Sequence, residues 1–193
     1  MNFNSSFNRD YSFWFPNNID YHIIPKNACS TVRHFLRQTI TKTPDLPNYP
    51  DDSYSYISIK EGMLLKKYYR SKRSSAVTFT IKRDPVERFI SAYTDIVMYR
   101  GKKKGSVKDF LEGKLKDIHF QSQTYFAGKA NDIDYVFDIT ELDKVAEFIS
   151  DMTKISIRNQ HIRKIPVEKV KLTKDEEINI LDHYKEDYVN GWY

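Results

Sequence analysis

Hydrophobic positions in this chain switch three times from short runs typical of strands to the spacing of an amphipathic helix. The first unit has an apolar run at 21–24, after which apolar residues recur at helical spacing as far as Ile40. The second has alternating β-branched and aromatic residues at 76–81, followed by an apolar helical stripe that reaches Val97. A third unit spans 135–152. Strands separated by helices in this way predict an α/β fold, with a P-loop-like parallel sheet flanked by helices in three layers.

The start of a helix is marked most clearly after the second strand. Asp84 is a good N-cap, Pro85 fits the first helical turn and Glu87 completes a capping box. A further helix is expected at 106–115, and a C-terminal helix opens at Thr173.

The length of 193 residues and the 40% hydrophobic content indicate one folded domain over 1–193. We expect an N-terminal extension at 1–20 and an unusually long connection at 41–75. Long connections often contact ligands, so the second of these is the leading candidate for substrate contacts, with plain surface decoration as the alternative.

Charge and cysteine content limit which partners, metal sites and cellular compartments we expect for this protein. The formal net charge of +5 suits an anionic ligand, but it is small and no nucleic-acid reading motif accompanies it, so we expect no nucleic-acid partner. Cys29 is the single cysteine, which excludes an internal disulfide and a cysteine-type metal site and favours a reducing compartment. No apolar run is long enough for a secretory signal or a membrane span. We therefore expect a soluble, cytoplasmic protein.

The first strand ends in PKNACST, a turn of small residues that opens a helix. Small side chains let backbone N–H groups approach an anion, and a helix N-terminus favours negative charge. Two hydroxyl residues in the turn can cap the helix and donate hydrogen bonds, while the lysine can reach the same anion. The alternative for one such turn is a routine N-cap beside a solvated lysine. The candidate binding residues here are Lys26, Asn27, Ala28, Cys29, Ser30 and Thr31.

A second turn favours anion binding over a routine helix cap. Arg83 follows the second strand, and Ser91 lies two helical turns further on, where both could meet an anion beside the helix start. Two such turns in adjacent units predict a ligand with two anionic groups, as in a nucleotide. The first turn is not an ATPase loop, because the chain has no glycine before Gly62 and Lys26 precedes the small residues.

The two segments IPKNACST and TIKRDPVERFISAY resemble the paired cofactor motifs of sulfotransferases, specifically the Golgi-type carbohydrate sulfotransferase group (sulfotransferase family 2). The resemblance implies that the co-substrate is 3′-phosphoadenosine 5′-phosphosulfate (PAPS) and that the product is 3′-phosphoadenosine 5′-phosphate (PAP). It implies that Lys26 contacts the bridging oxygen and the 5′ groups, that 28–31 wrap the 5′-phosphate, and that Arg83 and Ser91 hold the 3′-phosphate. The segment DIHFQSQTYF, with Gln121, is similar to a further family segment. Because the chain lacks an anchor and paired cysteines, it looks like a bacterial-type or viral member.

The resemblance implies in-line transfer of a sulfuryl group to a hydroxyl of a carbohydrate or other acceptor, without a metal. Lys26 would stabilise the charge that grows on the leaving phosphate. His119 is the first choice for the general base, because imidazole titrates near neutral pH, and Glu61 is the alternative. A structural role is preferred for Cys29 over a nucleophilic one. A nucleotide-binding module without turnover and a P-loop kinase remain as alternatives.

Overall fold

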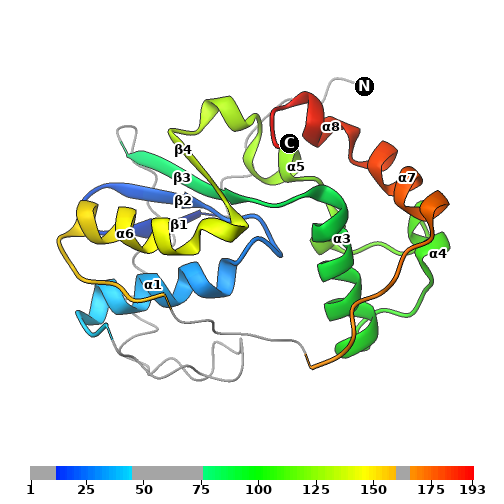
Figure 1. Cartoon of the computed structure of the whole chain (residues 1–193), viewed down its shortest axis with the longest axis horizontal. Coiled ribbons are helices and arrows are strands. Elements are labelled where there is room, and N and C mark those ends of the chain that lie inside the picture. The colour runs from blue at the N-terminus through cyan, green and yellow to red at the C-terminus, as the bar shows by residue number, and fades with distance from the viewer. Residues whose placement is uncertain (1–11, 45–75, 160–165) are drawn as a thin grey trace.

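The computed structural model of the chain describes residues 12–44, 76–159 and 166–193. Four strands form one sheet in the order β1 (Ser12–Phe15), β2 (Ile19–His22), β3 (Val77–Lys82) and β4 (Tyr135–Asp138). Strands β2, β3 and β4 are parallel, whereas β1 lies antiparallel to β2 at one edge (Figure 1). The predicted α/β class with a parallel sheet is confirmed.

The hairpin of β1 and β2 differs from the sequence prediction. The range 1–20, expected to be an N-terminal extension, contains β1 and the first residues of β2. The strands are joined by a tight turn in which Asn17 and Asn18 have φ of 62° and 64°. Asparagine tolerates this left-handed conformation better than most residues. The first parallel strand also begins earlier than the expected run at 21–24, since the turn and not the apolar run sets its start.

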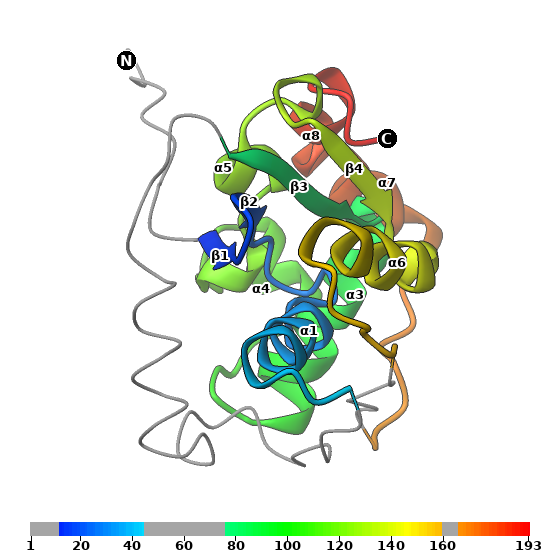
Figure 2. The same ribbon diagram turned by 90° about the vertical axis from the view of Figure 1, so that its left-hand side faces the viewer.

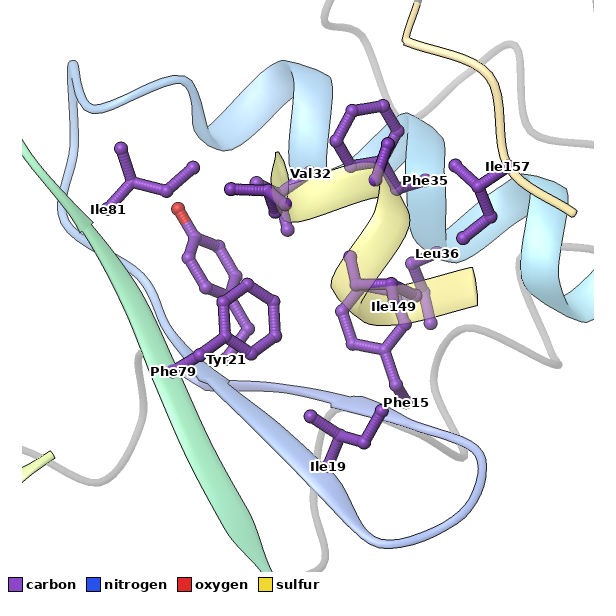
Figure 3. Close-up of a cluster of buried hydrophobic side chains, with 12 residues drawn as sticks. Phe15, Ile19, Tyr21, Val32, Phe35, Leu36, Phe79, Ile81, Ile149 and Ile157 are labelled. Carbon is purple, nitrogen blue, oxygen red and sulfur yellow. The ribbon is translucent and has the colours of Figure 1, made fainter. Parts of the chain in front are cut away.

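One face of the sheet packs against α1 (Cys29–Thr41) and α6 (Leu142–Thr153), which lie side by side (Figures 1 and 2). The apolar side chains of both helices point toward the strands (Figure 3). Phe79 lies at the centre, and its ring contacts those of Phe15, Tyr21, Phe137 and Phe148. The fully buried members of this core are Phe15, Ile19, Tyr21, Val32, Phe35, Leu36, Phe79, Ile81, Val145 and Ile149.

The opposite face is covered by a smaller apolar cluster. Val136, whose side chain leaves β4 on the other side from Phe137, packs with Phe126 of α5 (Gln123–Ala127) and with residues of the short helix η4 (Ala130–Asp132). Trp192 closes this cluster, and its indole Nε1 donates a 2.9 Å hydrogen bond to the carbonyl of Gly128. Helical segments therefore lie on both faces, as the three-layer prediction requires.

A third cluster lies beyond the carboxyl ends of the strands. It is centred on the rings of Phe89, Phe110, Phe120 and Tyr184. The elements around it are α3 (Pro85–Tyr93), the π-helix η2 (Thr94–Tyr99), α4 (Val107–Leu111), η3 (Ile118–Phe120), α7 (Lys174–His183) and α8 (Lys185–Val189). This cluster holds α3 against the sheet end where the two candidate turns lie.

Several helix starts are as the sequence predicts. The Asp84 carboxylate accepts a hydrogen bond from the Glu87 N–H at 2.9 Å, and Thr173 forms a capping box with Glu176. The helix expected at 106–115 is only α4, capped by Ser106. The strand of the third predicted unit, β4, leads into α6 through the short helix η5 (Ile139–Glu141).

Residues 45–75 of the long connection lie outside the described residues. None of the helices in the described ranges is long and apolar enough to cross a membrane.

Ile149 and Ile178 offer a matched test of the core that α6 covers. Ile149 is fully buried, whereas Ile178 on α7 is 63% exposed. Ile149→Ala should lower the free energy of unfolding by about 2–5 kcal/mol, because it removes buried methyl groups and leaves a cavity. Ile178→Ala should change it by less than about 0.5 kcal/mol. Urea denaturation measures both, and equal losses would contradict this packing.

Candidate active site

The two turns singled out by the sequence lie next to each other at the carboxyl ends of β2 and β3. Arg83 Nη1 donates a 3.2 Å hydrogen bond to the carbonyl of Lys26, and Asn27 Nδ2 donates a 2.7 Å bond to the carbonyl of Ile81. The carboxyl ends of neighbouring parallel strands are the usual location of nucleotide sites in α/β proteins. The turns therefore face one common region.

The backbone of the first turn is unusual. Lys26 has φ of 71° and Ala28 has φ of 57°, a left-handed conformation that costs a non-glycine residue about 1–3 kcal/mol. Such strain persists only where surrounding contacts impose it, and here Asn27, between the two, is fully buried and its Nδ2 donates hydrogen bonds to Ile81 and Gln123. Successive N–H groups in this kind of backbone form a concave anion-binding surface.

The start of α1 corrects one detail of the sequence prediction. Ser30 and Thr31 do not cap the helix, because its N-cap is Ala28 and no side chain in the described part of the chain caps it. Both hydroxyl residues lie inside the first helical turn. The N–H groups of a first turn have no partner within the helix. With an alanine as cap and no acidic residue in this turn, the helix start favours an external anion.

Arg83 is held close to the first turn with most of its side chain covered. The side chain is 12% exposed, and its Nε is buried with no hydrogen-bond partner among the described residues. Burial lowers the pKa of Arg83, and the nearby Glu87 carboxylate, 3.5 Å from Nη2, opposes that shift. A guanidinium at the end of a parallel strand is a good candidate for a phosphate ligand, because arginine forms strong, often paired hydrogen bonds with phosphate oxygens. Ser91 lies half-buried on α3, two turns further on.

Lys26 contacts a partner that the sequence did not indicate. Its Nζ lies 2.7 Å from Oδ2 of Asp95, a carboxylate on η2 that is 1% exposed. Arg100 Nε lies 2.8 Å from the other oxygen of the same carboxylate. Burial alone would raise the pKa of Asp95, but the hydrogen bonds and charges of Lys26 and Arg100 outweigh it and lower the pKa.

Gln123, at the start of α5, joins the two turns. Its Oε1 accepts hydrogen bonds from Asn27 Nδ2 at 2.6 Å and from the Arg83 N–H at 3.1 Å. Its Nε2 donates to the Arg83 carbonyl at 2.9 Å. Asp187 of α8 accepts from the N–H groups of Gln123 and Thr124 and so fixes the start of α5. Gln121, which the resemblance to the family singled out, is exposed.

Arg88 is a second connector that sequence reasoning missed. This arginine is fully buried on α3; its Nε donates to the Pro25 carbonyl at 3.1 Å and its Nη2 to the His119 carbonyl at 3.2 Å. Burial lowers the pKa of Arg88, and the neighbouring Tyr184 and Asp187 oppose the shift. One guanidinium thereby links the first turn to η3. In the sequence, only its position one residue before the apolar Phe89 could have indicated that Arg88 is buried.

His119 lies in η3 with its imidazole oriented by a carboxylate. Nδ1 of His119 is 2.6 Å from Oδ1 of Asp117, which also accepts from the His119 N–H at 3.0 Å. Burial would raise the pKa of Asp117, but these hydrogen bonds outweigh it and lower the pKa. The side chain of His119 is 33% exposed, so part of it remains accessible from outside. Glu61, the alternative base, lies outside the described residues.

The remaining site predictions concern Cys29 and metals. Cys29 is the first residue of α1, half-buried and with a free thiol. Among the described residues, no three His, Cys, Asp or Glu side chains cluster in a way that could hold a metal ion. Reaction without a metal stays a prediction.

Arg88→Met tests whether this arginine holds the two turns together. The Pro25 and His119 carbonyls would lose their donor, so the free energy of unfolding should fall by about 1–3 kcal/mol. Arg83→Met is the control: it removes a guanidinium that bonds one backbone carbonyl, and should cost less than about 1 kcal/mol. Denaturation of both variants gives the comparison. A larger loss for Arg83→Met would show that Arg88 is not the main connector.

Comparison with known proteins identifies the family of the chain. The model of the sulfotransferase family matches residues 16–189, a range that includes both turns, the His119 segment and α8. No curated protein and no solved structure gives a significant match. The family match covers most of the chain, and by it the protein belongs to the sulfotransferase family and is a transferase of sulfuryl groups.

Proposed function

We propose that this sulfotransferase takes the sulfuryl group from PAPS and transfers it to a hydroxyl of a carbohydrate acceptor. The observation that carries the proposal is the direct contact between the two turns, in which the Arg83 guanidinium donates to the Lys26 carbonyl. PAPS has anionic groups at its 5′ and 3′ positions, so it needs two anion sites on one side of a protein. The turns before α1 and α3 supply such a pair.

The assignment of the donor's two ends follows from the chemistry of each turn. The uncapped start of α1, with the left-handed backbone at Lys26 and Ala28, suits the 5′-phosphosulfate. Arg83 and Ser91 suit the 3′-phosphate, because a guanidinium binds phosphate oxygens through strong, often paired hydrogen bonds and a serine hydroxyl can donate another. In this arrangement 28–31 surround the 5′-phosphate, while the buried Asn27 fixes the turn from behind.

The proposed reaction is an in-line displacement at sulfur. The acceptor oxygen forms a bond to sulfur while the bond from sulfur to the bridging oxygen breaks, and the electron pair of that bond stays on the phosphate of PAP. Lys26 would stabilise the charge that grows on this oxygen. The hydroxyl proton passes to a general base, for which His119, oriented by Asp117, is the first candidate and Glu61 the second.

Binding of PAP tests the donor without an acceptor. At about 100 times its Kd, PAP should stabilise the protein by about 2.7 kcal/mol, which raises the Tm by about 5–11 °C at this chain length. AMP, which lacks the 3′-phosphate, should give a smaller shift at the same concentration. Arg83→Ala should lose most of the difference between PAP and AMP. Differential scanning fluorimetry measures all three.

Lys108→Ala is the control for that experiment, because Lys108 is an exposed cation on α4 and should leave the PAP shift unchanged. A shift with ATP and magnesium and none with PAP would instead favour a kinase. PAP binding without transfer from radiolabelled PAPS to any member of a broad carbohydrate panel would favour a binding module.

The general base can be identified by matched glutamine substitutions. If His119 is the base, His119→Gln should lower the transfer rate about 10²–10⁴-fold while the Kd for PAP stays the same. Glu61→Gln should then have a small effect, and His183→Gln controls for the loss of an imidazole outside the site. Single-turnover transfer of labelled sulfate measures the rates. A large loss in Glu61→Gln alone would move the assignment to Glu61.

A further inference from the structure

The pair formed by Lys26 and Asp95 has no role in the reaction as described. It consists of the proposed catalytic ammonium and a carboxylate that is almost completely buried, 2.7 Å apart. We infer that Asp95 is a positioning residue that competes with the anionic donor for the Lys26 ammonium and thereby sets how tightly the nucleotide binds. The inference rests on the proposed function, because it takes Lys26 as a ligand of the 5′ groups.

The π-helix η2 explains how Asp95 can release Lys26. In an α-helix, residues five apart point about 140° away from each other, whereas a π-helix bonds residue i to residue i+5 and brings the two closer to the same side of the helix. The Arg100 N–H donates to the Asp95 carbonyl at 2.9 Å, and the Arg100 side chain reaches the Asp95 carboxylate at 2.8 Å. The unusual helix thus gives Asp95 a second cation, from the residue that caps the C-terminal end of η2.

The two cations use different oxygens of the carboxylate. Lys26 contacts Oδ2 and Arg100 contacts Oδ1. A buried carboxylate left without any cation is strongly unfavourable. Because Arg100 stays in place, Asp95 remains paired when Lys26 turns toward a phosphate. The exchange therefore breaks one ion pair of Asp95 and keeps the other.

The accessibility of Lys26 also fits an exchange. Its side chain is 14% exposed, compared with 1% for Asp95, so an incoming anion can reach the ammonium but not the carboxylate. With Asp95 as its partner, the positive charge of Lys26 is largely neutralised. The donor must therefore offer a stronger interaction than this carboxylate does, and product PAP leaves more readily because Asp95 takes the ammonium back.

Calorimetric titration with PAP tests the inference. Asp95→Asn should tighten PAP binding about three- to ten-fold, because Lys26 no longer has to leave an anion. The KM for PAPS should fall in parallel. In a Lys26→Met background the same Asp95→Asn change should have no effect on the Kd, because there is then no ammonium for which Asp95 and PAP could compete. A merely structural Asp95 would not give an effect that depends on Lys26.

Arg100→Gln provides a second test with the opposite sign, and it does not depend on Asp95→Asn folding. Without Arg100, Asp95 holds Lys26 more strongly, so PAP should bind about two- to five-fold more weakly. Unchanged PAP affinity in both variants, or weaker binding in Asp95→Asn, would overturn the inference while wild-type PAP binding upholds the proposed function. Wild-type protein that binds no PAP would overturn both.

Discussion

The structure depends on the buried hydrogen bonds that join the two turns of the candidate site. Polar groups taken out of water must find partners, and here the partners of each turn come from the other turn or from a shared connector. Asn27 bonds to the carbonyl of Ile81, Gln123 bonds to both turns, and Arg88 ties the first turn to η3. Neither turn can therefore move alone without leaving buried donors or acceptors unpaired. A rigid frame of this kind can hold two anions at a fixed separation, which a donor with two charged ends requires.

The same frame accounts for the strained backbone next to Lys26. Left-handed residues other than glycine are unfavourable, and they survive where other contacts fix the chain. Asn27 is that fixed point, since its amide is buried between β3 and α5. The outcome is a left-handed turn that leads into an uncapped helix, while its lysine extends toward η2. Local strain, helix polarity and the position of one ammonium thus have a common origin in the packing of a single asparagine.

Much of the fold could be predicted from the sequence, because periodicity and capping are local properties. The parallel order of three strand-helix units, the cap at Asp84 and the capping box at Thr173 all follow from residues close together in the chain. The hairpin at β1 was missed because its turn uses two asparagines in place of glycine. The two anion turns could be found from short motifs. The partners Asp95, Gln123 and Asp187 could not, since they become neighbours of those motifs only after folding, and no spacing in the sequence encodes these contacts.

The bond from Asp187 to the start of α5 has a consequence for biosynthesis. Gln123 receives its orientation from a carboxylate that lies 64 residues later in the chain. A ribosome-bound nascent chain that already contains both turns still lacks this support, and Trp192, which seals the opposite face of the sheet, is synthesised later again. The proposed nucleotide affinity should therefore emerge late and abruptly during translation, when α8 docks, and not gradually as each turn leaves the exit tunnel.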